Sequence, residues 1–255
     1  MSAAATSDDV VDKIAQVGLV AFGVVHLVLG WLVVTLALGD REGSASTTGA
    51  MRQLDEQPLG GALVWAVSLG MFLLVVWQAV EAWTDDETKD RLVHAGRAVV
   101  YAVIGVSGVR VATGSGGGGG TDSMTARLMD APGGQLFVGA VGLGVVAVGG
   151  ALLWQAWTES YLDHLDGRGR SGDAGRAYRV LARVGHVAKG LALGAVGVLF
   201  GYAAATHDAK KSGGVDQALR QVLDQSGGPV VVGLLGLGFA AFGVYCFAWS
   251  RHLSR

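Results

Sequence analysis

An internal repeat constrains this chain more than any other feature of its sequence. Residues 50–83, 124–157 and 218–251 align with one another without a gap. An acidic residue coincides in the three copies, as do a glycine four positions later and a Leu-Gly pair ending ten positions after that: Glu56, Asp130 and Asp224; Gly60, Gly134 and Gly228; Gly70, Gly144 and Gly238. Self-similarity of this kind is typical of proteins built from copies of one supersecondary unit.

The segments that precede these copies repeat as well. Phe22–His26 aligns with Arg97–Tyr101 and Lys189–Leu193, and a glycine follows four positions after each segment: Gly30, Gly105 and Gly197. Each complete unit therefore contains two apolar segments. We place a polar N-terminal tail at residues 1–13, repeat 1 at 14–84, repeat 2 at 92–158, a basic insert at 159–179 and repeat 3 at 180–252.

The composition indicates a membrane protein. Hydrophobic residues make up 51% of the chain and charged residues 16%, and the charges cluster between apolar segments long enough for a hydrocarbon core of roughly 30 Å. Helix is the expected conformation because backbone groups in lipid must be satisfied within the segment, and the alternation of a barrel strand is absent. We predict spans at 15–38, 61–83, 92–113, 134–157, 181–205 and 229–250.

The predicted fold is therefore all-α, a polytopic membrane helical bundle of six transmembrane helices arranged as three two-helix repeats. Because each repeat has an even number of spans, all three share one orientation in the bilayer. This favours a pseudo-threefold arrangement about the membrane normal.

The segments that join the two helices of each repeat carry a second signal. The pattern in Thr47–Gln57, Thr121–Ala131 and Val215–Gln225 is amphipathic, and it ends at a Pro or Gly-Gly cluster that redirects the chain. We predict a short amphipathic helix at the outer interface in each repeat. Pro58 and Pro132 end the first two, whereas Pro229 suits the first position of the last span, where its missing N–H costs little.

The distribution of Lys and Arg predicts the orientation. Twelve fall on the side that carries both termini and seven on the other, which places both termini in the cytoplasm of a bacterial cell with a multi-pass protein in the plasma membrane. The N-terminus is acidic and the first apolar run is long, so we expect a retained span and not a cleaved signal peptide.

The basic insert supports two interpretations. Its arginines could bind anionic lipid headgroups or an acidic partner, or they could simply be the positive charge that sets the topology. The residues are Arg168, Arg170, Arg176, Arg179 and Arg183.

Glycine is unusually frequent, at 42 residues, and many glycines lie within the predicted spans. Spans associate in lipid through small residues that allow close backbone contact. The expected faces are Gly139, Gly142, Gly149 and Gly150 in the fourth span and Gly190, Gly194, Gly197 and Gly201 in the fifth. A glycine-lined solute path is the alternative.

Polar residues at membrane depth are candidate functional residues because they are costly there. His26 lies midway along the first span, at the repeat position of Tyr101 and Leu193. A haem ligand would need a second axial group at similar depth, and His94 and His186 lie near span ends. We therefore expect a histidine that is hydrogen-bonded to a neighbouring span, and no cofactor.

Three further intramembrane residues carry charge. Glu81 lies about one turn from the inner end of the second span and Arg97 about one turn inside the third, so the two could form an ion pair. The alternative is that both side chains extend to the interface. Lys189 occupies the repeat position of Arg97 and completes the candidate set with His26 and Tyr101.

The signals for catalysis and metal binding are weak. Asp163, His164 and Asp166, with Glu159 nearby, form the one dense acid–imidazole cluster, but a loop with two or three ligands makes a poor metal site. Nucleophile-elbow, Walker, HExxH and CxxC motifs are absent, and Cys246 lies in an apolar run. We predict no metal and no enzymatic activity.

The repeated unit resembles a known family. Its features are a small or basic residue followed by Gly-Val-Val-aromatic, a short outer helix ending in Pro or Gly-Gly, and a closing segment such as Trp154–Thr158. These are similar to the bacterial membrane-protein family numbered 1206 in the domain-of-unknown-function series. The resemblance implies three tandem two-span domains in a bacterial membrane and implies no activity. The chain departs from the pattern at Phe22, where a basic residue is expected, and at His26 and Leu193, where tyrosine is expected.

Three hypotheses about function remain. The leading one is a non-enzymatic accessory or scaffold component of a membrane complex, with the bilayer, anionic headgroups and a membrane-protein partner as contacts and no nucleic acid. The second is a small-solute transporter or channel with a path on the threefold axis. The third is a haem-binding redox protein that uses His26.

Overall fold

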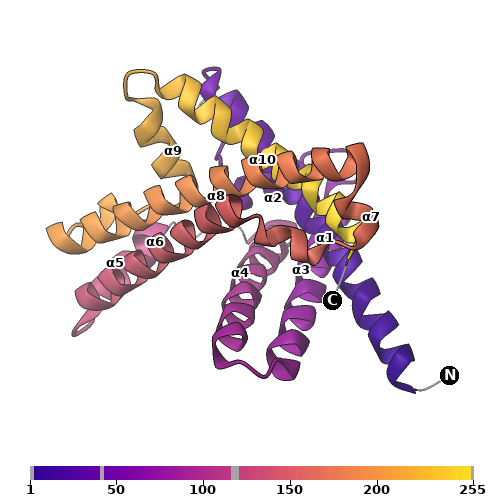
Figure 1. The fold of residues 1–255 in the computed structure, drawn as a ribbon. Helices are drawn as coiled ribbons and strands as arrows, with labels where there is room; N and C mark the ends of the chain where they lie inside the picture. The colour runs from indigo at the N-terminus through magenta and orange to yellow at the C-terminus, as the bar shows by residue number, and fades with distance from the viewer. Residues whose placement is uncertain (1–2, 41–42, 116–120, 254–255) are drawn as a thin grey trace.

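The computed structural model describes residues 3–40, 43–115 and 121–253, and six long helices dominate it (Figure 1). Each is long and apolar enough to cross a membrane, which confirms the predicted all-α membrane bundle. Their bounds are α1 Ala3–Ala37, α3 Gly60–Thr84, α4 Thr88–Ala112, α6 Gly134–Thr158, α8 Gly172–Thr206 and α10 Gly228–Arg251.

Two of these helices extend far beyond their predicted spans. Residues 3–13, predicted as a polar tail, are part of α1, and α8 begins at Gly172, well before the predicted start of the fifth span at 181. Hydropathy locates only the part of a helix that lies in hydrocarbon. Polar residues outside it can continue the same backbone hydrogen-bonding pattern.

A short helix connects the two long helices of each repeat: α2 (Thr47–Asp55), α5 (Thr121–Met129) and α9 (Val215–Leu223). These are the three amphipathic helices that the sequence predicts. The Ser46 hydroxyl caps α2 by accepting a hydrogen bond from the Gly49 N–H at 3.0 Å. Both α2 and α9 bury leucines, Leu54 and Leu219 among them, against the long helices.

A residue with a left-handed backbone conformation follows each of the three short helices, and a glycine comes directly after it in every repeat. Leu59, Gly133 and Gly227 occupy the same repeat position and have φ of 66°, 74° and 78°. The next residue, which is Gly60 in repeat 1, begins the following long helix. A Cβ there would overlap the carbonyl oxygen of Asp55. A Cβ on the equivalent Gly134 or Gly228 would likewise overlap a carbonyl oxygen of the preceding short helix, that of Leu128 or Val222. The short helix therefore returns to the bundle only if this residue is glycine.

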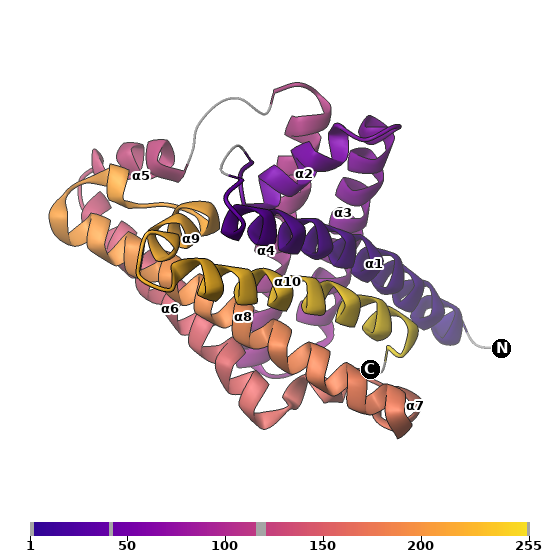
Figure 2. The same ribbon diagram turned by 90° about the horizontal axis from the view of Figure 1, so that it is seen from above.

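The long helices pack in a defined order. Successive repeats are joined by three equivalent interfaces, α3–α4, α6–α8 and α10–α1, and α1–α3 and α8–α10 also pack within repeats 1 and 3. Within the described residues α4 and α6 do not pack along each other, and in both views the α3–α4 pair diverges from the α6–α8 pair (Figures 1 and 2). A closed ring of six helices would also need α4 to pack along α6. The pseudo-threefold arrangement therefore stays a prediction.

Glycine brings the helices of two of these interfaces into backbone contact. A Cβ on Gly142 would lie 2.9 Å from the Gly197 carbonyl oxygen, and one on Gly149 would lie 2.7 Å from that of Gly190. The α1–α10 interface has glycine at the equivalent positions: Gly23, Gly30, Gly236 and Gly243. The predicted fourth-span and fifth-span faces therefore include the residues that hold α6 against α8.

The basic insert is a folded cap and not the polar loop that the sequence suggests. It contains a 3₁₀-helix at Ser160–His164 and a short helix, α7, at Gly167–Arg170. The Asp166 N–H donates to the His252 carbonyl at 2.8 Å, and the Tyr245 hydroxyl donates to the Tyr161 carbonyl at 3.0 Å. Tyr161 and Leu165 are buried. These two buried residues are hard to recognise in the sequence, because charged residues surround them.

Candidate functional site

The interior of the bundle contains a cluster of aromatic rings around one lysine. The Lys189 Nζ of α8 lies 3.6 Å from the ring centre of Phe242 and 5.1 Å from that of Phe22. The two rings meet edge to face, with centres 5.8 Å apart. The cation therefore lies against the faces of aromatic rings from α1 and α10, an arrangement in which the ring quadrupole attracts it.

His26 belongs to this cluster, and its hydrogen bond differs from the predicted one. Its Nδ1 lies 2.9 Å from the Phe22 carbonyl oxygen, so the partner is the preceding turn of its own helix and not a neighbouring span. The ring is buried and packs edge to face on Phe22, with centres 4.2 Å apart. His186 makes the same bond to Ala182 at 2.7 Å. Neither hydrogen bond links two helices, because each carbonyl belongs to the histidine's own helix.

Tyr101 brings α4 to the same cluster. Its buried ring packs edge to face on Phe22, with centres 5.1 Å apart. Arg97 lies one turn earlier on α4, at the repeat position of Lys189 and Phe22. Of the five intramembrane candidates, the structure thus gathers His26, Tyr101 and Lys189 around Phe22. Arg97 lies on the turn of α4 that precedes Tyr101.

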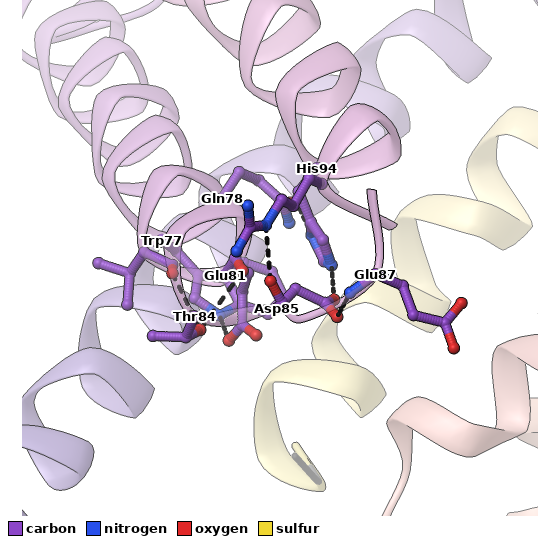
Figure 3. Close-up of polar contacts among 9 residues, drawn as sticks. Trp77, Gln78, Glu81, Thr84, Asp85, Glu87 and His94 are labelled. Carbon is purple, nitrogen blue, oxygen red and sulfur yellow. Dashed lines mark hydrogen bonds and ion pairs between the residues drawn. The ribbon is translucent and has the colours of Figure 1, made fainter. Parts of the chain in front are cut away.

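Glu81 lies apart from this cluster. It accepts a hydrogen bond from the Trp77 Nε1 at 3.0 Å at the end of α3 (Figure 3). Within the described ranges Arg97 takes part in no ion pair, so the suggested Glu81–Arg97 pair is not formed. The indole on its own helix is nearer to Glu81 than the cation across the turn.

A polar group that the sequence reasoning missed holds the α3–α4 turn instead. The His94 Nδ1 lies 2.7 Å from the Gln78 Oε1, and its Nε2 lies 3.5 Å from the Asp85 carboxylate (Figure 3). Arg91 donates to the Asp85 carbonyl at 2.7 Å. The sequence does contain one signal for this group, because His94 and His186 occupy the same repeat position.

The arginines of the insert are largely engaged within the chain. Glu159 holds Arg183 at 2.6 Å and Arg179 at 3.3 Å, and Arg176 pairs with Asp173. Arg170 donates to the Leu165 carbonyl at 2.6 Å. Arg168 is exposed. A patch with four of its five cations bonded internally presents less free positive charge to headgroups than the sequence suggests.

The acid–imidazole cluster of the insert separates into structural contacts. His164 stacks on Trp249 with ring centres 5.0 Å apart, and burial, followed by the positive charge of Arg97, lowers the pKa of His164 to about 4. Asp166 accepts from the Gly169 N–H at 2.7 Å, and this hydrogen bond lowers the pKa of its carboxyl. In the part of the chain that the structure describes, no three His, Cys, Asp or Glu residues are grouped to hold a metal.

Comparison with known proteins identifies the repeated unit. The family model described as Domain of Unknown Function (DUF1206) matches residues 17–85, 92–159 and 184–252. The chain belongs to the DUF1206 family. The resemblance read from the sequence is thereby confirmed, including its three tandem copies.

A full-length relative is also found. The chain is 25% identical over 244 residues to the uncharacterized protein YxxB of Bacillus subtilis (strain 168), a match that covers 92% of this chain and 88% of that protein. No solved structure matches. A bacterial multi-pass membrane protein agrees with the family, the relative and the six apolar helices.

The three DUF1206 units differ in how their two helices meet. In units 1 and 3 a Cβ on the second-helix glycine, Gly70 or Gly238, would overlap the Cβ of Ala21 or Ala188 on the first helix. In unit 2 the corresponding residues are Gly144 and Gly96, and for both glycines the space where a Cβ would lie is open. We call the two exposed faces that carry these glycines, one on α4 and one on α6, the seam.

Proposed function

We propose that this DUF1206 protein is a non-enzymatic accessory component of a bacterial plasma-membrane complex, and that a partner's transmembrane helix packs in the seam. The observation that carries the proposal is the unpaired state of Gly144 and Gly96, whose counterparts in units 1 and 3 contact a helix. Glycine faces are the surfaces through which helices associate in lipid.

The burial of the spans supports this location. Of the most apolar stretch in each span, 17% is buried in α6 and 22% in α4, against at least 44% in the other four. Helices with so little of their surface in contact with the chain have the most surface left for a second protein.

The residues of the seam favour a partner helix between α4 and α6 over direct packing of α4 against α6. Units 1 and 3 close with glycine on one helix and alanine on the other, whereas the seam has glycine on both. We expect the partner helix to present a small residue to these two glycines, because close backbone contact needs small residues on both sides.

The packing of the interior favours the accessory role over a solute path. The rings of Phe22, Tyr101 and Phe242 fill the region where the first helices meet, with centre-to-centre distances of 5.1 and 5.8 Å. A continuous hydrophilic path would require these rings to separate.

Co-purification with a matched pair of variants tests the proposal. The tagged chain is extracted from its own membranes in mild detergent, as wild type, Gly144→Leu and Gly150→Leu. Gly150 is a matched control because it also has open space at its Cβ position, and its repeat equivalents, Val76 and Val244, are exposed. We expect a stoichiometric membrane partner with the wild type and Gly150→Leu and its loss with Gly144→Leu.

Cysteine cross-linking locates the occupant. In a Cys246→Ala background, Gly144→Cys should form a bismaleimide adduct, or under oxidising conditions a disulfide, with a cysteine introduced into the transmembrane helix of the co-purified partner. An intramolecular disulfide in the double variant Gly96→Cys, Gly144→Cys would contradict the proposal, because the chain would then close the seam with its own helices. Equal recovery of the partner with Gly144→Leu would contradict it as well.

We also propose that both termini lie in the cytoplasm. The charge bias supports this orientation, with twelve Lys and Arg on the side of the termini against seven on the other. Alkaline phosphatase folds actively only outside the cytoplasm, so a C-terminal fusion should be inactive and a fusion after Gly114 active. The reverse result would invert the orientation.

A further inference from the structure

Two half-buried cationic side chains come from the same repeat position on different helices. Lys189 of α8 and Arg97 of α4 align with Phe22 of α1. The Lys189 Nζ lies 5.1 Å from the Phe22 ring centre, and the ring of Tyr101, one turn after Arg97 on α4, packs on Phe22 with centres 5.1 Å apart. Arg97 lies within electrostatic range of Lys189. The first helices of the three repeats therefore bring their equivalent side chains together.

Neither cation has a carboxylate partner in the described ranges of the chain. Lys189 contacts the rings of Phe22 and Phe242, and Arg97 forms no ion pair. Two acidic residues of the insert are bonded to other groups: Glu159 to two arginines, and Asp166 to His252 and the Gly169 N–H.

Two like charges in this setting are unfavourable. Charged groups within a bilayer are costly unless they are paired, and two cations within range of each other add repulsion. Aromatic faces attract a cation but leave the net charge unchanged. A bound anion would neutralise the charge and remove the repulsion at once.

We propose that Lys189 and Arg97 together bind a phosphate oxyanion inside the bundle. Arg97 offers a planar fork of donors that matches two phosphate oxygens, and Lys189 offers a compact point charge. The hydroxyl of the buried Tyr101 supplies a neutral donor, and the rings of Phe22 and Phe242 form the apolar wall. The oxyanion belongs either to a lipid headgroup or to free phosphate, and either source reaches the site from the end of the bundle that carries the termini.

Two probes distinguish these sources. The complete chain is purified in phosphate-free detergent solution, titrated calorimetrically with inorganic phosphate, and analysed by native mass spectrometry with phosphatidylglycerol. Binding of phosphate alone identifies the free anion, and binding of phosphatidylglycerol alone identifies a headgroup. Lys189→Met and Arg97→Met should each raise the dissociation constant of the probe that binds by roughly ten- to a hundredfold. This is the effect of losing one charge-assisted hydrogen bond.

Three further variants make the test specific. Lys189→Arg should retain binding because it keeps the charge. Tyr101→Phe, which removes one hydroxyl and preserves the packed ring, should weaken binding by about tenfold or less and provides a result if a methionine variant fails to fold. Arg168→Met removes an exposed cation and should have no effect. The proposal is overturned if neither probe binds, if folded Lys189→Met binds as the wild type does, or if Arg168→Met weakens binding equally.

Discussion

Gly30 of α1 and Gly236 of α10 lie against each other's backbone. A Cβ on Gly30 would lie 2.8 Å from the Gly236 carbonyl oxygen, and a Cβ on Gly236 would lie 3.0 Å from that of Gly30. The same pair of repeat positions, Gly197 and Gly142, joins α8 to α6. This reciprocal contact sets the separation of the helices at two of the three junctions between repeats.

Gly30→Ala should therefore destabilise the bundle. The added methyl group must push α1 away from α10, an overpacking cost of about 1–3 kcal/mol. Gly194→Ala is the control, because its Cβ would meet no atom within 4 Å. Equilibrium unfolding in mixed micelles measures the difference, and equal stability of the two variants would refute the contact.

Leu59→Gly should stabilise the protein. Leu59 has φ of 66°, a conformation that costs an L-residue about 1–2 kcal/mol, whereas its repeat equivalents are already glycine. The side chain is 83% exposed, so little packing is lost. Leu63→Gly, four residues later inside α3, should instead destabilise by about 1 kcal/mol. Thermal unfolding should show opposite signs, and a shared sign would contradict the turn geometry.

Tyr245→Phe should loosen the insert. The Tyr245 hydroxyl donates to the Tyr161 carbonyl at 3.0 Å, and losing a buried hydrogen bond of this kind costs about 1 kcal/mol. Trypsin should then cleave after Arg168 and Arg170 faster than in the wild type, as measured by mass spectrometry of timed digests. An unchanged cleavage rate would mean that this bond does not anchor the cap.

Stability should fall as the pH drops from about 6.5 to about 4, in part because of His164. Burial lowers the pKa of its imidazole from 6.5 to about 4 in the folded chain. Over this interval the unfolded state binds a proton that the folded state does not, so acid favours unfolding. Above pH 6.5 this group contributes no pH dependence.

His164→Phe separates this contribution from the others. It removes the titrating group and keeps an aromatic ring on Trp249, so the melting temperature should decline less between pH 7 and pH 4.5 than in the wild type. Parallel curves for the two proteins would assign the acid sensitivity to other residues.

The sequence alone determined the elements of this fold because hydropathy and repeat spacing are properties of one segment at a time. The three copies, the six spans and the short helices before Gly60, Gly134 and Gly228 follow from residues that are neighbours along the chain. The need for glycine at these three positions is equally local, since the obstructing carbonyl belongs to the preceding short helix.

Tertiary structure decided which of these elements touch. Gly144 looks equivalent to Gly70 and Gly238 in the sequence, yet it alone lacks the facing helix. Glu81 bonds to Trp77 and not to Arg97, and Tyr161 anchors an insert that its charges made look like a loop. Lipid gives no hydrophobic preference for one helix pairing over another, so pairing depends on the fit of two surfaces that lie far apart in the chain.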